Sequence, residues 1–348
     1  MSKFQTTIGH LLGIFKKMAN NINRTLSTHG SLKPRAENIL RGLSEDQLFY
    51  QAHNSKHPLT IYQTSLDRVS SAWLKIFPLL SKMDMEISYR QEPTVGAEIL
   101  AEYETLLHRL NEHIDACHEA LRCLRPPVPG KKDTYHHQFL ERSRFPGWES
   151  FKKNIHKQYR DPHISFMVNE IKHSSAELFL CNGMTPTAPV CGFYLTGAYP
   201  GGALGPNREL HKKFGNVATA FSFNRDMMMN FWWLYQISEA FAQCIEGVIH
   251  HDHGGLKLSE VKSSVPSPEW TKLCQECASL KRSFFPDELT KPFPIIVVPA
   301  GGSSLSMKLQ PPKRFGTYAP MDMKLPLKLK EATRSFVMPY YEPNAQQK

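Results

Sequence analysis

The sequence predicts a mainly α-helical protein, a helical bundle with a small antiparallel β element inserted into it. Apolar residues recur at intervals of three and four over several long segments, which is the spacing of one face of a helix. Only a few short runs have the character of strands, and the two clearest are 190–196 and 217–223. The chain has 348 residues, of which 41% are hydrophobic and 21% charged, so it can bury a full core.

Three parts are expected along the chain. Residues 1–34 are predicted to form a basic amphipathic helix, with apolar positions from Phe4 to Ile22, and a linker. Residues 35–305 are predicted to form the helical domain, with the β element at about 189–224. Residues 306–348 contain six prolines and a basic surplus without a periodic apolar face, so we expect an extended and poorly packed tail.

The first helices of the domain are expected over 35–57, 60–88 and 94–124. Pro78 lies inside the second of these and should kink or split it, because proline removes a backbone donor and clashes with the preceding turn. The third has a continuous apolar stripe from Ile99 to Leu124 and is stopped by two prolines.

The second half of the domain begins with a helical region over 148–180, interrupted near residue 161. The two strand-like runs follow. Residues 227–249 are apolar nearly all round apart from one thin polar stripe, which is typical of the central helix of a bundle. A shorter helix is expected over 267–284 and a buried strand over 294–298.

The net charge of +10 and the scattered cysteines limit the classes of function. A basic surplus allows contact with nucleic acid or an anionic membrane without requiring it. Seven dispersed cysteines do not form a disulfide framework, which favours a reducing cytoplasm. The most apolar stretch, 227–249, carries too many polar residues to span a bilayer, while the N-terminal helix is suited to dock on a partner or a membrane surface.

Asn169 and His173 are four residues apart on a predicted helix, so their side chains share one face. A polar pair among apolar residues costs free energy unless it is hydrogen-bonded or used in function. This stretch resembles the HEPN-type helical domains, in which Arg-Asn-x-x-x-His forms an RNA-cleaving site. The resemblance covers about a dozen residues and implies that Asn169 and His173 are catalytic. Val168 stands where the family has its arginine, which removes the cation of that site; a purely structural Asn–His pair is the alternative.

A carboxylate three residues before a histidine occurs twice on predicted helices, as Asp115–His118 and Glu170–His173. This spacing places both ligands on one face, as in di-iron carboxylate proteins, and Glu239 or Glu246 on the central helix could supply a bridging carboxylate. A zinc site made from His250, His251 and His253 with Cys274 and Cys277 is a second possibility, against buried cysteines that only pack.

Basic residues interleaved with aromatic ones follow the third predicted helix. Such a pattern suits phosphate contact with base stacking, although a solvated helix face looks the same in sequence. The residues that form this predicted nucleic-acid-binding set are Lys131, Lys132, Arg142, Arg144, Lys152, Lys153, Lys157 and Arg160.

The favoured function is therefore a cytoplasmic, non-catalytic binding module with a basic face, with nucleic acid as the expected anion. The alternative is an enzyme that uses a helix-borne site, either a HEPN-like ribonuclease or a metal-dependent oxidoreductase. The sequence leaves open whether the protein is an enzyme and which cofactor, if any, it uses.

Overall fold

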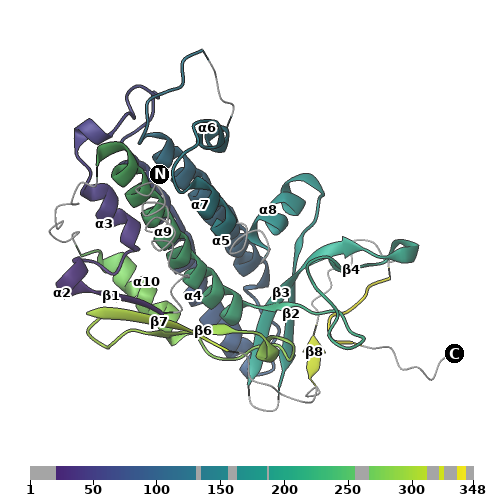
Figure 1. Ribbon diagram of the computed structural model, residues 1–348. Helices are drawn as coiled ribbons and strands as arrows, with labels where there is room; N and C mark the ends of the chain where they lie inside the picture. The colour runs from purple at the N-terminus through teal and green to yellow at the C-terminus, as the bar shows by residue number, and fades with distance from the viewer. Residues whose placement is uncertain are drawn as a thin grey trace.

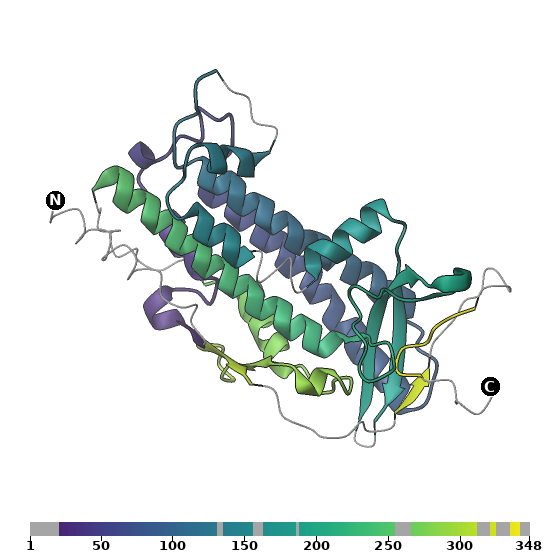
Figure 2. The same ribbon diagram turned by 45° about the vertical axis from the view of Figure 1, so that its right-hand side comes forward.

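In a computed structural model, the described part of the chain forms three long helices, several shorter ones and two antiparallel sheets (Figure 1). The structure describes residues 21–130, 135–155, 163–185, 188–254, 266–311, 321–324 and 335–341. The long helices lie side by side, and the five-stranded sheet crosses one of their ends (Figure 2). The three-stranded sheet packs along the side formed by helices α9 and α10.

Among the described helices, α4, α5 and α9 are long and the others are short. The helices are α2 (Leu26–His29), α3 (Arg35–Arg41), α4 (Pro58–Ser88), α5 (Gly96–Arg122), α6 (His136–Arg142), α7 (Trp148–Ile155), α8 (Ile164–His173), α9 (Phe223–His253) and α10 (Pro268–Ser279). Single 3₁₀ turns occur as η1 (Glu45–Gln47), η3 (Pro200–Gly202) and η4 (Glu288–Thr290).

The strands divide into two sheets, each built from segments far apart in the chain. The first has the order β1 (Asn21–Thr25), β7 (Ser304–Gln310), β6 (Phe293–Val297). The second has the order β4 (Leu204–Pro206), β3 (Pro189–Ala198), β2 (Leu178–Met184), β8 (Asp322–Lys324), with β5 (Phe221–Ser222) also paired to β3. All the pairings between these strands are antiparallel.

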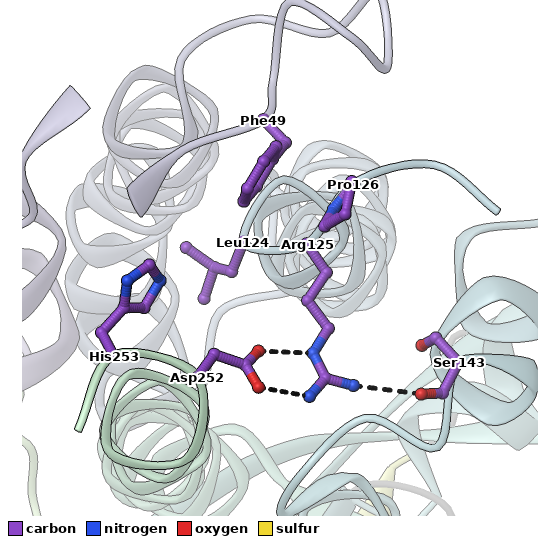
Figure 3. Close-up of a pocket in the computed structure, with 7 residues that line it drawn as sticks. All are labelled: Phe49, Leu124, Arg125, Pro126, Ser143, Asp252 and His253. Carbon is purple, nitrogen blue, oxygen red and sulfur yellow. Dashed lines mark hydrogen bonds and ion pairs between the residues drawn. The ribbon is translucent and has the colours of Figure 1, made fainter. Parts of the chain in front are cut away.

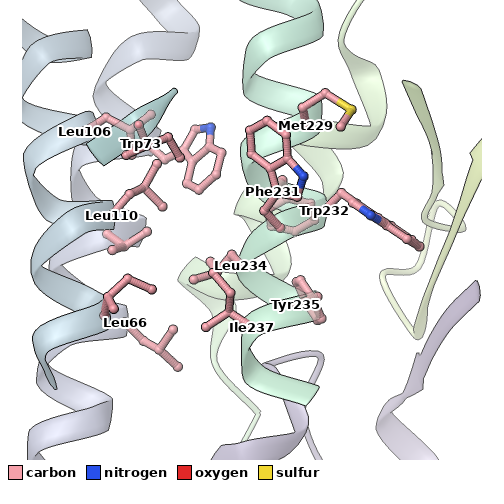
Figure 4. Close-up of a cluster of buried hydrophobic side chains, with 14 of the residues drawn as sticks. Leu66, Trp73, Leu106, Leu110, Met229, Phe231, Trp232, Leu234, Tyr235 and Ile237 are labelled. Carbon is pink, nitrogen blue, oxygen red and sulfur yellow. The ribbon is translucent and has the colours of Figure 1, made fainter. Parts of the chain in front are cut away.

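Helices α4 and α5 form an antiparallel hairpin, and α9 packs against it. α4 starts with Pro58, whose missing N–H costs nothing at a first helical position, and the His57 ring accepts a hydrogen bond from the Leu59 N–H. Of the two expected effects of Pro78, a kink or a split, the split is not observed, because α4 continues to Ser88. Large side chains fill the space between the hairpin and α9, and the Trp73 and Phe231 rings meet edge to face at 5.7 Å (Figure 4).

The prediction of a central helix at 227–249 is confirmed by α9, which is buried on nearly all sides. Of its expected polar stripe, Gln236 is buried, whereas Glu239, Gln243 and Glu246 lie at the boundary of the core. There Arg35 of α3 pairs with Glu239 at 2.7 Å and also with Glu246. Burial of two unpaired carboxylates would be costly, so this guanidinium allows α9 to pack against α3.

The predicted fold class is wrong. The protein is a mixture of α-helix and β-sheet, with sheets of three and five strands, and is neither all-α nor a bundle with one small β insertion. The strand expected at 294–298 is present as β6 and the one at 190–196 as β3, but 217–223 contributes only the two residues of β5. Strand β2 begins at residues 178–180, which we expected to be the end of a helical region, and continues beyond that region to Met184.

The ends of the chain also differ from expectation. Most of the predicted N-terminal helix, residues 1–20, lies outside the described residues, and Ile22 belongs to strand β1. The helix expected over 35–57 ends at Arg41. Part of the predicted loose tail is packed, since β7 pairs with β1 on one side and β6 on the other, and Tyr340 is 5% exposed. Residues that pair from opposite ends of the chain show no local signal in sequence.

Close contact between strands β3 and β5 requires a glycine at position 192. A Cβ atom there would meet the backbone oxygen of Phe221 and the ring of Phe285 well inside van der Waals distance. This approach brings β5, and with it the start of α9, against the five-stranded sheet.

A candidate binding groove between α4 and α5

A groove of about 500 Å³ follows the seam between α4 and α5. Its walls come from one face of each helix, and the loop before α4 and the start of α6 close one end. The residues that line it are Asn54, Ser55, Lys56, Ile61, Thr64, Ser65, Arg68, Arg109, Glu112, Asp115, Ala116, Glu119 and His136. A pocket that contains titratable groups with altered pKa values is the usual place to look for function.

A buried serine and histidine join the two walls of the groove. Ser65 Oγ lies 2.7 Å from His113 Nδ1 and donates a hydrogen bond to the Tyr62 carbonyl at 2.8 Å. Burial lowers the pKa of His113 to about 4, so the ring is neutral at pH 7. Because the Ser65 hydroxyl donates its hydrogen bond to the Tyr62 carbonyl, its oxygen acts as the acceptor toward the ring. We therefore assign His113 Nδ1–H as the donor to Ser65 Oγ.

This Ser–His pair is arranged to hold the helices together rather than to act as a nucleophile. A catalytic serine needs its proton directed to the base, with an acid to orient that base. Ser65 directs its proton elsewhere, and the other ring nitrogen of His113 faces the Cys117 thiol at 3.8 Å. Within the described chain, no carboxylate is hydrogen-bonded to His113.

Two arginines lie at the same level at one end of the groove. The Ser65–His113 contact fixes the register of the antiparallel helices, so Arg68, one turn past Ser65, lies opposite Arg109, one turn before His113. Arg109 pairs with Glu112 at 2.6 Å. Arg68 is exposed and makes no ion pair with any residue that the structure describes.

Two carboxylates line the groove on the other side of the Ser65–His113 contact. Asp115 lies 3.9 Å from His118, and Glu119 lies 4.0 Å from His136. Burial lowers the pKa of both histidines, to about 3 for His118, so both rings are neutral at pH 7. In the described parts of the chain, neither carboxylate therefore has a cation at ion-pair distance.

A second cavity, of about 440 Å³, lies at the C-terminal ends of α5 and α9 (Figure 3). Arg125 forms a two-pronged ion pair with Asp252, with both distances 2.6 Å, and donates to the Ser143 carbonyl at 3.0 Å. Because these groups satisfy one another, this cavity is the weaker candidate for a charged ligand.

A buried polar network connects α9 with α5 and with the residue before α8. Asp226 accepts hydrogen bonds from Tyr103, from Asn230 at 3.0 Å and from His163 at 2.7 Å. Burial raises the pKa of Asp226 to about 6 and lowers that of His163 to about 3. His163 has a φ of 128°, in the region that favours glycine, and its ring stacks on Phe221 at 4.5 Å.

Sequence reasoning missed the residues of this network. Two signals were available in the sequence. Asp226 is an acid in the first turn of the apolar helix α9, and Tyr103 is a tyrosine within the apolar stripe of α5. Both features are common in purely structural roles. Neither the groove nor the second cavity is lined by residues of this network, so the network is better explained as stabilising the core than as a site for substrate.

The predicted catalytic pair lies on the surface. Asn169 and His173 are both exposed on α8, and the half-buried position that motivated the prediction is not observed. Val168, which replaces the arginine of the HEPN-type motif, is instead buried in the core. Catalysis by this pair stays a prediction without further support.

The predicted metal ligands Asp115, His118, Glu170, His173 and Glu239 do not gather at one point. Over the residues that the structure describes, no group of three or more histidine, cysteine and acidic side chains is placed to hold a metal. Asp115 and His118 are neighbours on α5, whereas Glu239 is paired with Arg35. For the zinc alternative, Cys274 and Cys277 are buried in α10, and His251 contacts Asp252.

Half of the predicted nucleic-acid-binding set lies outside the described residues, namely Lys131, Lys132, Lys157 and Arg160. Of the rest, Arg142, Lys152 and Lys153 belong to the short helices α6 and α7, and Arg144 lies between them. Lys152 forms an ion pair with Glu141, so its charge is locally balanced. The structure gives no support to nucleic-acid binding as a description of this protein.

Comparison with known proteins finds no match to a protein family, to a curated protein or to a solved structure. In the described part of the chain, no helix is both long and apolar enough to cross a membrane.

Proposed function

We propose that this protein binds a small ligand through an anionic group at the arginine end of the α4–α5 groove. The observation that carries the proposal is the pair formed by Arg68 and Arg109, which line a cavity of about 500 Å³ at the same level. A guanidinium offers a planar fork of donors that suits a carboxylate or a phosphate. Arg68 has that fork free of ion pairs to described residues, and the Thr64 hydroxyl lies one turn before it.

Binding is favoured over catalysis because the groove holds its reactive groups in unreactive states. The serine donates to a backbone carbonyl, the histidine is neutral and buried, and the nearby Cys117 thiol has a pKa raised well above its usual value by burial. A thiol kept protonated is a poor nucleophile. The groove can therefore offer a ligand the charge of its arginines and the hydrogen-bonding groups that line it.

The proposal is tested by calorimetric titration of the protein with inorganic phosphate and with acetate at low ionic strength. Replacing Arg68 by Met keeps an unbranched, flexible side chain and removes the guanidinium with its charge. A charge-assisted hydrogen bond contributes about 1.5 kcal/mol or more, so R68M should weaken binding at least about tenfold.

Arg282→Met is the matched control, because Arg282 is an exposed arginine outside the groove. It should leave the affinity for phosphate unchanged. Equal affinities for the parent protein and R68M, or no binding of either anion at low salt, would overturn the proposal. Thermal unfolding of each variant checks that the fold is retained.

A further inference from the structure

We propose that the second cavity, at the C-terminal ends of α5 and α9, binds a flat, uncharged aromatic molecule of about two or three fused rings. The inference goes beyond the proposed function, because this cavity shares no lining residue with the α4–α5 groove. Three features of the cavity carry it: the apolar walls, the engaged donors of Arg125, and the volume.

Apolar and aromatic side chains form the walls of the cavity. Phe49 comes from the loop before α4, and Leu124 follows the end of α5. In Figure 3 the Phe49 ring, the Leu124 side chain and the His253 ring surround a common space. The paired side chains of Arg125 and Asp252 lie along its edge. A molecule that fills this space buries mostly apolar surface, which is the usual source of affinity in a small-molecule pocket.

The arginine and the carboxylate that line the cavity neutralise each other. Arg125 donates to Asp252 through Nε and Nη2, both at 2.6 Å, and these hydrogen bonds hold the pKa of Asp252 below its usual value. His251 Nδ1 contacts the same carboxylate. A charged ligand group would have to displace one of these partners, whereas an uncharged ligand leaves the ion pair intact. The cavity therefore disfavours a ligand with a net charge.

The guanidinium of Arg125 offers a ligand its flat face rather than free donors. Its third nitrogen, Nη1, donates to the Ser143 carbonyl at 3.0 Å, so all three nitrogens are engaged. The guanidinium carbon lies over the ring of Phe145, 5.6 Å from the centroid, and Phe145 does not line the cavity. The face that remains can stack on an aromatic ring of a ligand, which a planar guanidinium does more favourably than an ammonium group. An aliphatic ligand of the same size lacks this interaction.

Hydrogen bonds fix the walls of the cavity in the free protein. The Phe49 N–H donates to the Cys123 carbonyl at 2.7 Å, which ties the loop before α4 to the end of α5. His53 Nε2–H donates to the Arg125 carbonyl, also at 2.7 Å, and holds the same loop at a second point. Walls held in this way lose little conformational entropy when a ligand binds.

The volume of about 440 Å³ sets the size of the ligand. An apolar cavity of about 150 Å³ holds one benzene ring, so a cavity of this volume has room for about two or three fused rings. A single ring would leave one wall without contacts and forfeit their dispersion energy.

Indole and cyclooctanol test the preference for an aromatic ligand, because both are uncharged and they have similar sizes. We expect calorimetric titration of the full chain to give an affinity for indole at least about fivefold higher than for cyclooctanol. Competition titrations test the preference for an uncharged ligand. Indole-3-acetate should displace indole less effectively than 3-methylindole, which adds only a methyl group to the same rings.

Variants test the stacking on the guanidinium. Arg125→Lys keeps a positive charge beside Asp252 but removes the planar group, so it should weaken indole about three- to fivefold and leave cyclooctanol unchanged. Phe49→Leu keeps an apolar wall without a ring and should act in the same direction. Arg208→Lys is the matched control, because Arg208 lies over the Tyr199 ring at 4.3 Å, outside the cavity, and it should change neither affinity. Thermal unfolding checks that each variant is folded.

Ser143→Trp tests the location of the site, since a large side chain at this half-buried lining position should fill the cavity and abolish binding of both probes. Four results would overturn the proposal: no binding of indole by the parent protein, indole binding that survives in Ser143→Trp, equal losses of indole and cyclooctanol in Arg125→Lys, or equal displacement by indole-3-acetate and 3-methylindole. None of these results bears on anion binding in the groove, which the phosphate titration tests separately.

Discussion

Replacement of Tyr103 by Phe tests whether the buried network on α9 holds an ionised carboxylate. Tyr103 is 0% exposed, and its hydroxyl donates to Asp226 and accepts from Asn230 at 3.2 Å. Hydrogen bonds to charged groups contribute about 1.5–3 kcal/mol. We expect Y103F to lower the free energy of unfolding by about 2–3 kcal/mol at pH 8, where Asp226 is ionised.

The loss of stability caused by Y103F should increase as the pH rises. Burial raises the pKa of Asp226 from 3.8 to about 6 on folding. The folded state therefore holds its proton more strongly, and the contribution of Asp226 to stability falls by about 3 kcal/mol as the pH rises from about 4 to about 6. The Tyr103 hydrogen bond limits this loss because it lowers the pKa of Asp226. Without it the loss continues to higher pH, so the variant should approach the parent below pH 5 and diverge from it above pH 6.

The assay is equilibrium unfolding in urea, followed by tryptophan fluorescence at pH 5 and pH 8. Tyr62→Phe is the matched control, since Tyr62 is also 0% exposed but donates to the neutral Ser238 hydroxyl at 2.9 Å. It should cost about 1 kcal/mol at either pH. Equal costs for Y103F at the two pH values, or a cost no larger than that of Y62F, would refute an ionised Asp226 in the folded protein.

Three further predictions concern packing, an ion pair and thiol chemistry. Gly192→Ala should cost more than about 3 kcal/mol in urea unfolding, because its Cβ would overlap the facing strand, whereas Gly247→Ala, with open space at its Cβ, should be neutral or stabilising. Arg35→Met should cost about 1 kcal/mol at low salt and less in 1 M NaCl, since the partly exposed pairs with Glu239 and Glu246 are screened; a cost independent of salt would contradict this. All seven cysteines are buried and free, and burial raises their pKa, so native protein should resist iodoacetamide at pH 8 while urea-unfolded protein takes up seven labels. Labelling of the native protein at the rate of the unfolded chain would show that the thiols are accessible.

The long helices could be predicted from the sequence because their signal is local. The apolar spacing in α5 and the apolar composition of α9 depend only on neighbours within a few turns. Strands β3 and β6 could also be recognised as short apolar runs between turn residues. For these elements the predicted and observed limits differ by a few residues at most ends.

The groove was visible in the sequence only as separate residues. Asp115 was singled out for its spacing to His118, and Arg68 and Arg109 attracted no attention because they lie 41 positions apart on different helices. Their relation depends on the register that Ser65 and His113 set across the hairpin. Register between two helices is decided by side-chain packing and is not encoded in the periodicity of either one.

The sequence by itself determined where the three long helices α4, α5 and α9 lie, that the cysteines form no compact framework, and that α9 lies in the core. Only the tertiary structure decided that this is a mixed α/β protein. Strand β1 at the start of the described chain pairs with β7 nearly 300 residues later, and β2 begins within the last residues of a predicted helical region and continues past its end. The free energy of such pairing comes from hydrogen bonds and burial between distant segments, so it leaves no pattern in either segment alone.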